Sequence, residues 1–259
     1  RGWQEVSLHK AGYGLGSRDE AASSGKKWFP YNKGGEFRKW FGNNEFLVNW
    51  ENDGRSVRAF GTENGGRARS RAQNTDYYFL PSVTWSFVSS SYFGVRYSDA
   101  GAVFDVGGSS AFPSVEDHLW TTGFLCSKQV FGFMKVMNPT LNFQVGNVAA
   151  LPVLRQEVLG RKFEIEAGVT RLIECTRTDW DAYERSWDFQ SLPLLTASTE
   201  STPTLESSYT AWITQNRDTI AEMKRLEEEN NRLFIDAYGL QDELTPDVPL
   251  EQITLTVNP

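Results

Sequence analysis

The pattern of hydrophobic and polar positions changes at about residue 155. Before it, from residue 28, short alternating runs rich in Phe, Tyr, Trp, Val and Gly are typical of half-buried β-strands. Four runs are predicted as strands, at 46–48, 76–80, 93–97 and 102–106. Gly-Gly, Asn-Gly-Gly and Asn-Asp-Gly sequences predict turns between them, at 34–35, 52–54, 64–66 and 107–108. Residues 117–127 suit a short helix or another strand, because their periodicity favours neither.

After Pro152 the apolar positions recur at helical spacing. Residues 155–177 predict one helix, and Thr178 with Asp181 resembles a capping box that would start a second, ending at Trp187. Residues 191–204, rich in Ser, Thr, Leu and Pro, predict a linker. The longest predicted helix runs over 205–238, with an apolar stripe opposite a charged face and Gly239 as its stop. Such a stripe is more often a packing face than a functional surface.

These patterns predict an α+β fold, with a mixed β domain followed by a helical spacer and a long C-terminal helix. The predicted segments are a connector at 1–27, the β domain at 28–155, the spacer at 156–200, and the long helix with an acidic tail at 201–259. Hydrophobic residues make up 39% of the 259 residues and aromatic residues 14%, which is enough to build a core.

Charge is distributed unevenly along the chain. The net charge is -7, but residues 26–71 hold ten basic and five acidic side chains, whereas residues 217–259 hold ten acidic and four basic ones. A phosphate backbone would be attracted to the first segment and repelled by the second. Both segments could also be ordinary solvated surface.

Few residues suit metal or disulfide chemistry. The two cysteines, Cys126 and Cys175, lie in apolar contexts that predict buried thiols, which fits a reducing cytoplasm. They and the two histidines are not spaced as metal ligands. We see no signal-peptide pattern and no apolar run that approaches a membrane span, so we expect a cytoplasmic protein without a membrane contact.

Two segments carry side chains that could contact nucleic acid. Residues 84–97 interleave hydroxyl groups with aromatic rings and Arg96, and residues 65–74 form a basic loop with amide side chains. Hydroxyl groups can donate to phosphates or bases, and arginine can bond guanine in the major groove. For the first segment, composition alone favours an edge strand with a solvated serine face. For the second, residue type alone fits groove insertion and an ordinary surface loop equally.

A resemblance to a known protein family favours the hypothesis that the chain binds nucleic acid. The stretch at 84–112 reads TWSFVSSSYFGVRYSDAGAVFDVGGSSAF. It is preceded by WFPYNKGGE at 28–36 and VNW at 48–50, and followed by NPTLNFQVG at 138–146 and LP at 151–152. Further on stand DWDAYERSWDF at 179–189, LPL at 192–194 and NRLFIDAYGL at 231–240. In this order the motifs resemble the target-recognition domain, helical spacer and tail helix of adenine-specific DNA methyltransferases. The set covers nearly the whole chain and resembles those of single-chain restriction-modification and BREX phage-defence systems.

The sequence departs from that family in lacking its catalytic parts. The loop for the methyl donor and the Asn-Pro-Pro-aromatic tetrapeptide are absent. Residues 138–141 read Asn-Pro-Thr-Leu, which predicts a turn that re-enters the sheet rather than a catalytic motif. The resemblance therefore implies the C-terminal recognition part of a larger enzyme. We expect no catalytic residues and no cofactor in this chain, with S-adenosylmethionine bound by the missing N-terminal methyltransferase domain.

The resemblance also implies a role, in which the full enzyme flips an adenine out of the duplex and methylates its N6 while this part selects the adenine. We expect phosphate contacts or groove entry from Lys33, Arg38, Arg58, Arg67, Arg69 and Arg71. We expect contacts close to the bases from Thr84, Ser86, Ser89, Ser90, Arg96 and Asp99. The expected partners are double-stranded DNA, the methyltransferase domain, and other defence-system proteins or a phage DNA-mimic inhibitor.

Two other classes of function stay open at this point. The chain could be a protein-interaction scaffold of a defence complex without DNA binding, which its acidic C-terminal segment favours. A carbohydrate-binding β-domain is suggested by the Trp and Tyr content alone. A steep loss of duplex binding with rising salt would separate DNA recognition from both.

Overall fold

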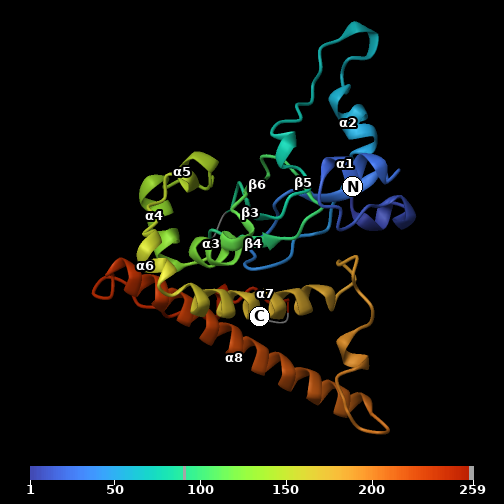
Figure 1. Cartoon of the computed structure of the whole chain (residues 1–259). Helices are drawn as coiled ribbons and strands as arrows, with labels where there is room; N and C mark the ends of the chain where they lie inside the picture. Colours follow the sequence, from blue (N-terminus) through green and yellow to red (C-terminus); the bar gives the residue numbers. More distant parts are fainter. Residues whose placement is uncertain (90–91, 257–259) are drawn as a thin grey trace.

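The computed structural model describes residues 1–89 and 92–256, and it joins two small β-sheets to a layer of helices (Figure 1). This arrangement confirms the predicted α+β class with its long C-terminal helix. The first sheet has the order β2-β1-β5, and the second has the order β4-β3-β6. Strand β1 (Trp28–Asn32) pairs antiparallel with β2 (Leu47–Asn49) and parallel with β5 (Val103–Phe104).

The second sheet is antiparallel throughout. Its central strand β3 (Ser82–Ser86) lies between β4 (Val95–Ser98) and β6 (Gly108–Ala111). All five residues of β3 are buried. Val83 and Trp85 face the main core and α3, and on the other face the Ser86 hydroxyl donates to the Gly35 carbonyl of the loop after β1.

Three of the four predicted strands are confirmed, and one is wrong. The runs at 46–48, 93–97 and 102–106 correspond to β2, β4 and β5. The run at 76–80 is instead a short 3-10 helix (Thr75–Tyr77) followed by Phe79 in the left-handed region, at φ 71°. Tyr78 and Phe79 are buried in the core beside the first sheet, whereas Tyr77 is 48% exposed. The turn at 138–141 does return to the sheet, since the Phe143 amide donates to the Phe87 carbonyl at 2.7 Å.

Two short helices lie beside the first sheet, α1 (Arg18–Ser23) and α2 (Glu51–Arg58). The turn predicted at 52–54 forms the start of α2, where all three residues have positive φ between 51° and 71°. Gly54 is required there, because a Cβ would lie 2.5 Å from the Trp50 ring. Trp50 joins a small core with Phe29, Tyr78, Phe79 and Val103.

Helices α3 (His118–Leu125), α4 (Lys128–Met137) and α5 (Val145–Ala149) follow the second sheet. The ambiguous stretch at 117–127 is therefore helical. Helix α4 was not predicted, since its many Phe and Val residues favour a strand as readily as a helix. It is helical because Val130 and Met134, one turn apart, are buried in the main core.

The spacer contains α6 (Arg155–Leu159) and α7 (Lys162–Asp181), so the single helix predicted at 155–177 is interrupted at Gly160. The second helix predicted at 178–187 is wrong. Thr178 lies inside α7, where its carbonyl accepts from the Ala182 amide at 3.1 Å, and the segment after Asp181 is a series of turns. A capping box needs an extended residue at the cap, and α7 passes through this position instead.

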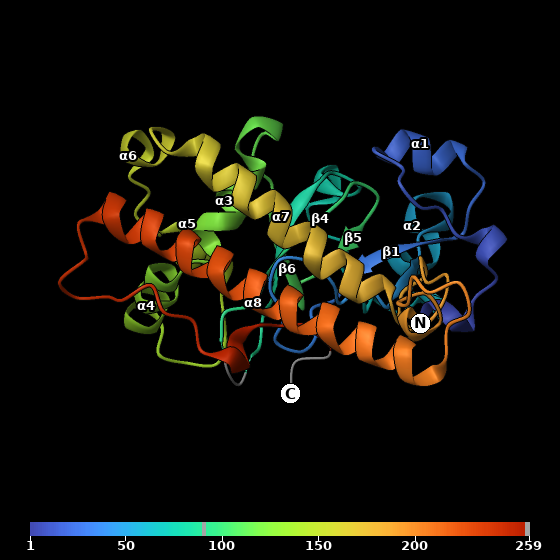
Figure 2. The same ribbon diagram turned by 90° about the horizontal axis from the view of Figure 1, so that it is seen from below.

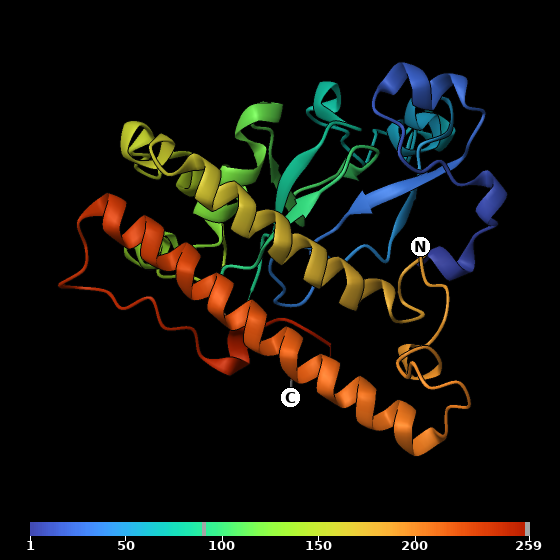
Figure 3. The same ribbon diagram turned by 60° about the horizontal axis from the view of Figure 1, so that its bottom comes forward.

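Helix α8 spans Leu205–Tyr238, as predicted. Thr204 and Ser207 cap its start reciprocally, and Gly239 ends it in the left-handed conformation at φ 66°. The predicted linker before it contains one 3-10 turn, Pro193–Leu195. Figures 2 and 3 show α7 and α8 as two long antiparallel helices laid across the sheets. Over residues 1–89 and 92–256, no helix combines the length and apolar character needed to cross a membrane.

The main core joins both halves of the chain. It packs Trp85 and Val95 of the second sheet against Phe124 of α3, Leu172 of α7 and Phe234 of α8. The segment after α8 turns back into this core, where Val248, Ile253 and Leu255 are buried. The Lys39 amide donates to the Thr254 hydroxyl at 3.0 Å, across 215 residues of sequence. Cys126 and Cys175 are buried free thiols, as predicted.

Candidate DNA interface

Residues 59–74 form an arm that projects from the body of the protein beyond α2 (Figure 1). Two hydrogen bonds close its base: the Arg69 amide donates to the Phe60 carbonyl at 2.8 Å, and the Ser70 hydroxyl donates to the Val57 carbonyl. Gly61 turns the chain at φ 86°, and a Cβ there would lie 2.6 Å from the Arg69 side chain. The arm therefore has a fixed base and a solvent-exposed end.

Three arginines make the arm basic. Arg67, Arg69 and Arg71 are all exposed, and none of them forms an ion pair with any residue in the described part of the chain. The arm contains one acidic residue, Glu63. Guanidinium groups without a carboxylate partner have no internal contact to lose when a phosphate binds.

Further cations lie near the base of the arm. Arg58 is exposed, contacts the Asp53 carboxylate at 3.3 Å, and lies over the Trp50 ring at 5.3 Å. Arg55, one turn earlier in α2, is also exposed and was not among the residues expected to bind DNA. Its position three residues before Arg58 is the signal that could have indicated it, once α2 is recognised as a helix. Elsewhere, Lys33 directly after β1 is also exposed and lies over the Phe46 ring at 4.7 Å.

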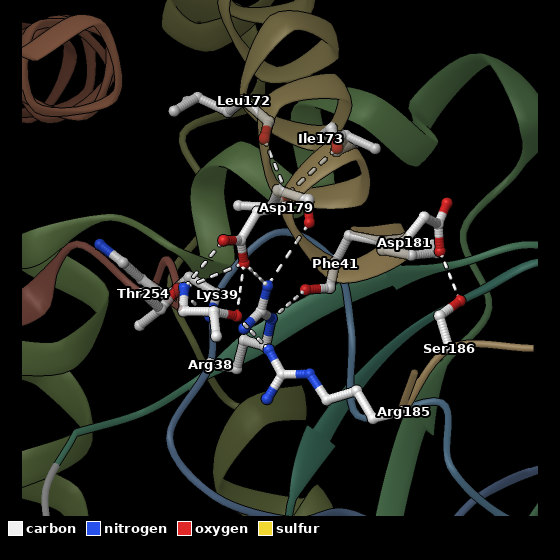
Figure 4. Close-up of polar contacts among 12 residues, drawn as sticks. Arg38, Lys39, Phe41, Leu172, Ile173, Asp179, Asp181, Arg185, Ser186 and Thr254 are labelled. Atoms are coloured by element: carbon white, nitrogen blue, oxygen red, sulfur yellow. Dashed lines mark hydrogen bonds and ion pairs between the residues drawn. The ribbon is translucent and has the colours of Figure 1, made fainter. Parts of the chain in front are cut away.

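Arg38 faces inward. Its guanidinium donates to Asp179 at 2.6 Å and to the Phe41 carbonyl at 2.8 Å (Figure 4). It also lies 4.9 Å from the Trp180 ring centre. Burial lowers the pKa of Arg38 from its ordinary value, against the opposing effect of Asp179. Arg38 is 6% exposed, and its contacts join the loop before Trp40 to α7.

Neighbouring Lys39 is buried in the same way. It pairs with Glu227 of α8, and the same carboxylate accepts from the Trp40 indole at 2.8 Å. Arg38 and Lys39, two of the ten basic residues at 26–71, thus hold the loop before Trp40 to α7 and α8. The charge available to a ligand comes from the remainder of that segment.

Three of the residues expected near the bases are buried in the second sheet. The Thr84 hydroxyl donates to the Ser109 carbonyl at 3.1 Å, and the Ser86 hydroxyl donates to the Gly35 carbonyl at 2.9 Å. Arg96 is 2% exposed, and burial lowers its pKa to about 10. One of its nitrogens donates to the Gly94 carbonyl at 3.3 Å. The hydrogen bonds of these three side chains are made inside the protein, where they stabilise the sheet.

Ser89 and Asp99 have contacts outside the arm. The Ser89 hydroxyl donates to the Tyr92 carbonyl at 2.9 Å, and Ser90 lies outside the described residues. Asp99 is exposed and pairs with Arg177 of α7 at 2.8 Å. The structure therefore brings together Arg58, Arg67, Arg69 and Arg71 on and beside the arm, and separates them from the sheet residues of the same prediction.

Comparison with known proteins identifies relatives of the chain. It is 38% identical over 252 residues to the adenine-specific methyltransferase PglX of Lacticaseibacillus casei, covering 95% of this chain and 20% of that protein. It is 32% identical over 261 aligned positions to the adenine-specific methyltransferase BrxX of Escherichia coli, covering 100% of this chain and 19% of that protein. The chain is homologous to a part of PglX and BrxX. No protein-family model matches it.

The homology to PglX and BrxX confirms the resemblance seen in the ordered motifs, and it extends over nearly the full chain. The chain spans about one-fifth of the length of these relatives. The arm, the sheets and the helical layer therefore correspond to one section of a PglX-like polypeptide.

Proposed function

We propose that the chain is the target-recognition part of an adenine-specific DNA methyltransferase that acts in phage defence. The homology to PglX and BrxX supports the enzyme class. The observation that carries DNA recognition is the arm, an exposed projection with three arginines that form no ion pair within residues 1–89 and 92–256. Its composition and shape suit entry into a groove or contact with the phosphates beside it.

In this proposal the arm and α2 hold the duplex by charge. Each phosphate that a lysine or arginine neutralises releases counterions, so affinity falls steeply as salt rises. Arg67, Arg69 and Arg71 enter the groove and neutralise the phosphates that line it, and Arg55, Arg58 and Lys33 contact the flanking phosphates. The acidic face of α8 is held away from the duplex, because like charges repel. The methyl transfer itself belongs to a separate domain that binds S-adenosylmethionine and receives the flipped adenine.

The proposal is tested by fluorescence anisotropy with random-sequence duplex DNA across a salt series. We expect an Arg67/Arg69/Arg71→Ala variant to bind at least tenfold more weakly than the wild type. The slope of log affinity against log salt should fall by roughly 3, since each lost phosphate contact contributes about 0.9. A matched control is Arg217/Arg225/Arg232→Ala, which removes the same charge from exposed positions of α8.

Equal losses in the two variants would show attraction by net charge and would refute the role of the arm. The absence of binding by any variant at low salt would favour the scaffold alternative. Sequence selection needs a second test in the full-length enzyme. Exchanging residues 61–72 for the equivalent segment of a relative with a different target should change the methylated sequence, and an unchanged sequence would confine the arm to non-specific contacts.

A further inference from the structure

A cavity of about 290 Å³ lies on the side of the first sheet that faces α7. It is bounded by the N-terminal segment at Tyr13, by β1 at Tyr31, by the end of α7, and by the turn that contains Trp187. Its volume is close to the lower end of the range for small-molecule sites, about 300–1,000 Å³. The DNA interface proposed above uses none of these residues.

Carboxylates dominate the charge of the cavity. Asp99, Asp181 and Asp188 line it together with one cation, Arg177, which pairs with Asp99 at 2.8 Å. The Asp181 carboxylate accepts from the Ser186 hydroxyl at 2.6 Å (Figure 4). Burial raises the pKa of Asp181, and Asp188 adds to the rise through repulsion. A phosphate or carboxylate ligand would be repelled here, whereas a cation would relieve this repulsion.

Aromatic rings form the other walls. Tyr13 and Trp187 lie with their ring centres 5.2 Å apart at an interplanar angle of 41°, and Tyr31 lines the cavity beside them. Trp180 is also a lining residue, and its ring is already engaged by the guanidinium groups of Arg38 and Arg185, at 4.9 and 4.2 Å. Tryptophan and tyrosine rings attract ammonium and guanidinium groups through their negative faces.

We propose that this cavity binds an organic cation with a primary ammonium or guanidinium group. The Tyr13 and Trp187 rings would contact this group on one side, and the carboxylates of Asp181 and Asp188 would contact it on the other. An aliphatic stem of a few carbons would lie along the rings, as lysine stems do on apolar surfaces. The chemistry is shared by a free polyamine and by a lysine or arginine side chain of a protein partner. The site acts independently of DNA binding.

The test is isothermal titration calorimetry of the chain without DNA, with 1,5-diaminopentane and with N-acetyl-lysine methylamide as probes. Pentane-1,5-diol serves as the neutral control ligand and should not bind. An Asp181→Asn/Asp188→Asn variant should bind the amines at least tenfold more weakly, and Trp187→Leu several-fold more weakly. Asp242→Asn/Glu243→Gln, with the same charge change after α8, should bind as the wild type does.

Binding of the diamine alone would identify a free polyamine as the ligand, and binding of the capped lysine would identify a protein side chain. Equal weakening in the two double variants, or no amine binding at millimolar concentrations, would overturn the proposal. Circular dichroism of each variant shows whether it is folded. Because Asp181→Asn keeps an oxygen that can accept from Ser186, it separates loss of charge from loss of structure.

Discussion

Replacing Asp179 with alanine tests the buried ion pair that joins the loop before Trp40 to α7. The Asp179 carboxylate accepts from Arg38 at 2.6 Å and from the Thr256 amide and hydroxyl at 2.9 Å each. The side chains of Arg38 and Asp179 are each 8% exposed. Without Asp179, the guanidinium of Arg38 would be buried with no carboxylate in direct contact, and Glu45 would act on it only from a distance.

Breaking such a pair by removing one partner costs about 3–5 kcal/mol. Because 1 kcal/mol shifts the melting temperature of a protein of this size by about 2–4 °C, we expect a loss of roughly 6–20 °C. The assay is thermal unfolding followed by circular dichroism, together with urea unfolding. The control is Glu229→Ala, which breaks an exposed pair with Arg232 and should cost less than about 1 kcal/mol.

The loss of stability comes from the unpaired charge of Arg38, so a second substitution that removes this charge should restore part of it. Arg38→Met in the Asp179→Ala background removes the buried guanidinium and keeps an apolar stem against Trp180. We expect the double variant to be more stable than Asp179→Ala alone. The explanation is refuted if Asp179→Ala lowers the free energy of unfolding by no more than Glu229→Ala does. It is also refuted if the double variant is the least stable of the set.

Two further perturbations follow from other contacts. His118 is 6% exposed and stacks on Tyr97 with ring centres 4.4 Å apart, and burial lowers its pKa. Below about pH 6.5 the unfolded chain therefore binds a proton that the folded protein does not, and the free energy of unfolding should fall as the pH drops below about 6.5. In His118→Phe, the urea midpoint should depend less on pH between 7.5 and 5. A pH dependence equal to that of the wild type would contradict this. Gly42→Ala should destabilise the protein by about 1–3 kcal/mol in the same assay, because φ of Gly42 is 122° and a Cβ would lie 2.4 Å from the Arg38 side chain. The control is Gly146→Ala, since Gly146 has open space around it. Equal stability of the two variants would contradict the prediction.

The elements that the sequence predicts well have local signals at their ends. Helix α8 has a capping residue at Thr204, a continuous apolar stripe and a glycine at 239, so its limits are determined by neighbours in the chain. Helix α4 has no comparable signals. Its conformation depends on packing against α8, about one hundred residues away in sequence, and the Asn231 side chain accepts from its Lys128 amide at 2.9 Å.

The candidate site likewise has parts that the sequence predicts and parts that it does not. The exposed arm was predictable, since Gly65, Gly66 and three arginines in one stretch indicate a loop that cannot be buried. The burial of Arg38 and Arg96 was not, because a charged residue alternating with aromatic ones reads the same at a surface and in a core. The partner of Arg38 lies 141 residues further along the chain, and only the assembled fold shows the pair.

The return of residues 248–256 into the main core has a consequence for synthesis. Lys39 cannot reach Thr254 until 215 further residues have been made, which at about 5–20 residues per second takes roughly 10–40 s. During that time the Trp40 and Trp180 region lacks the segment that covers it in the native state. Contacts so distant in sequence form late, so this apolar surface stays without its native cover until the segment at 248–256 has been synthesised.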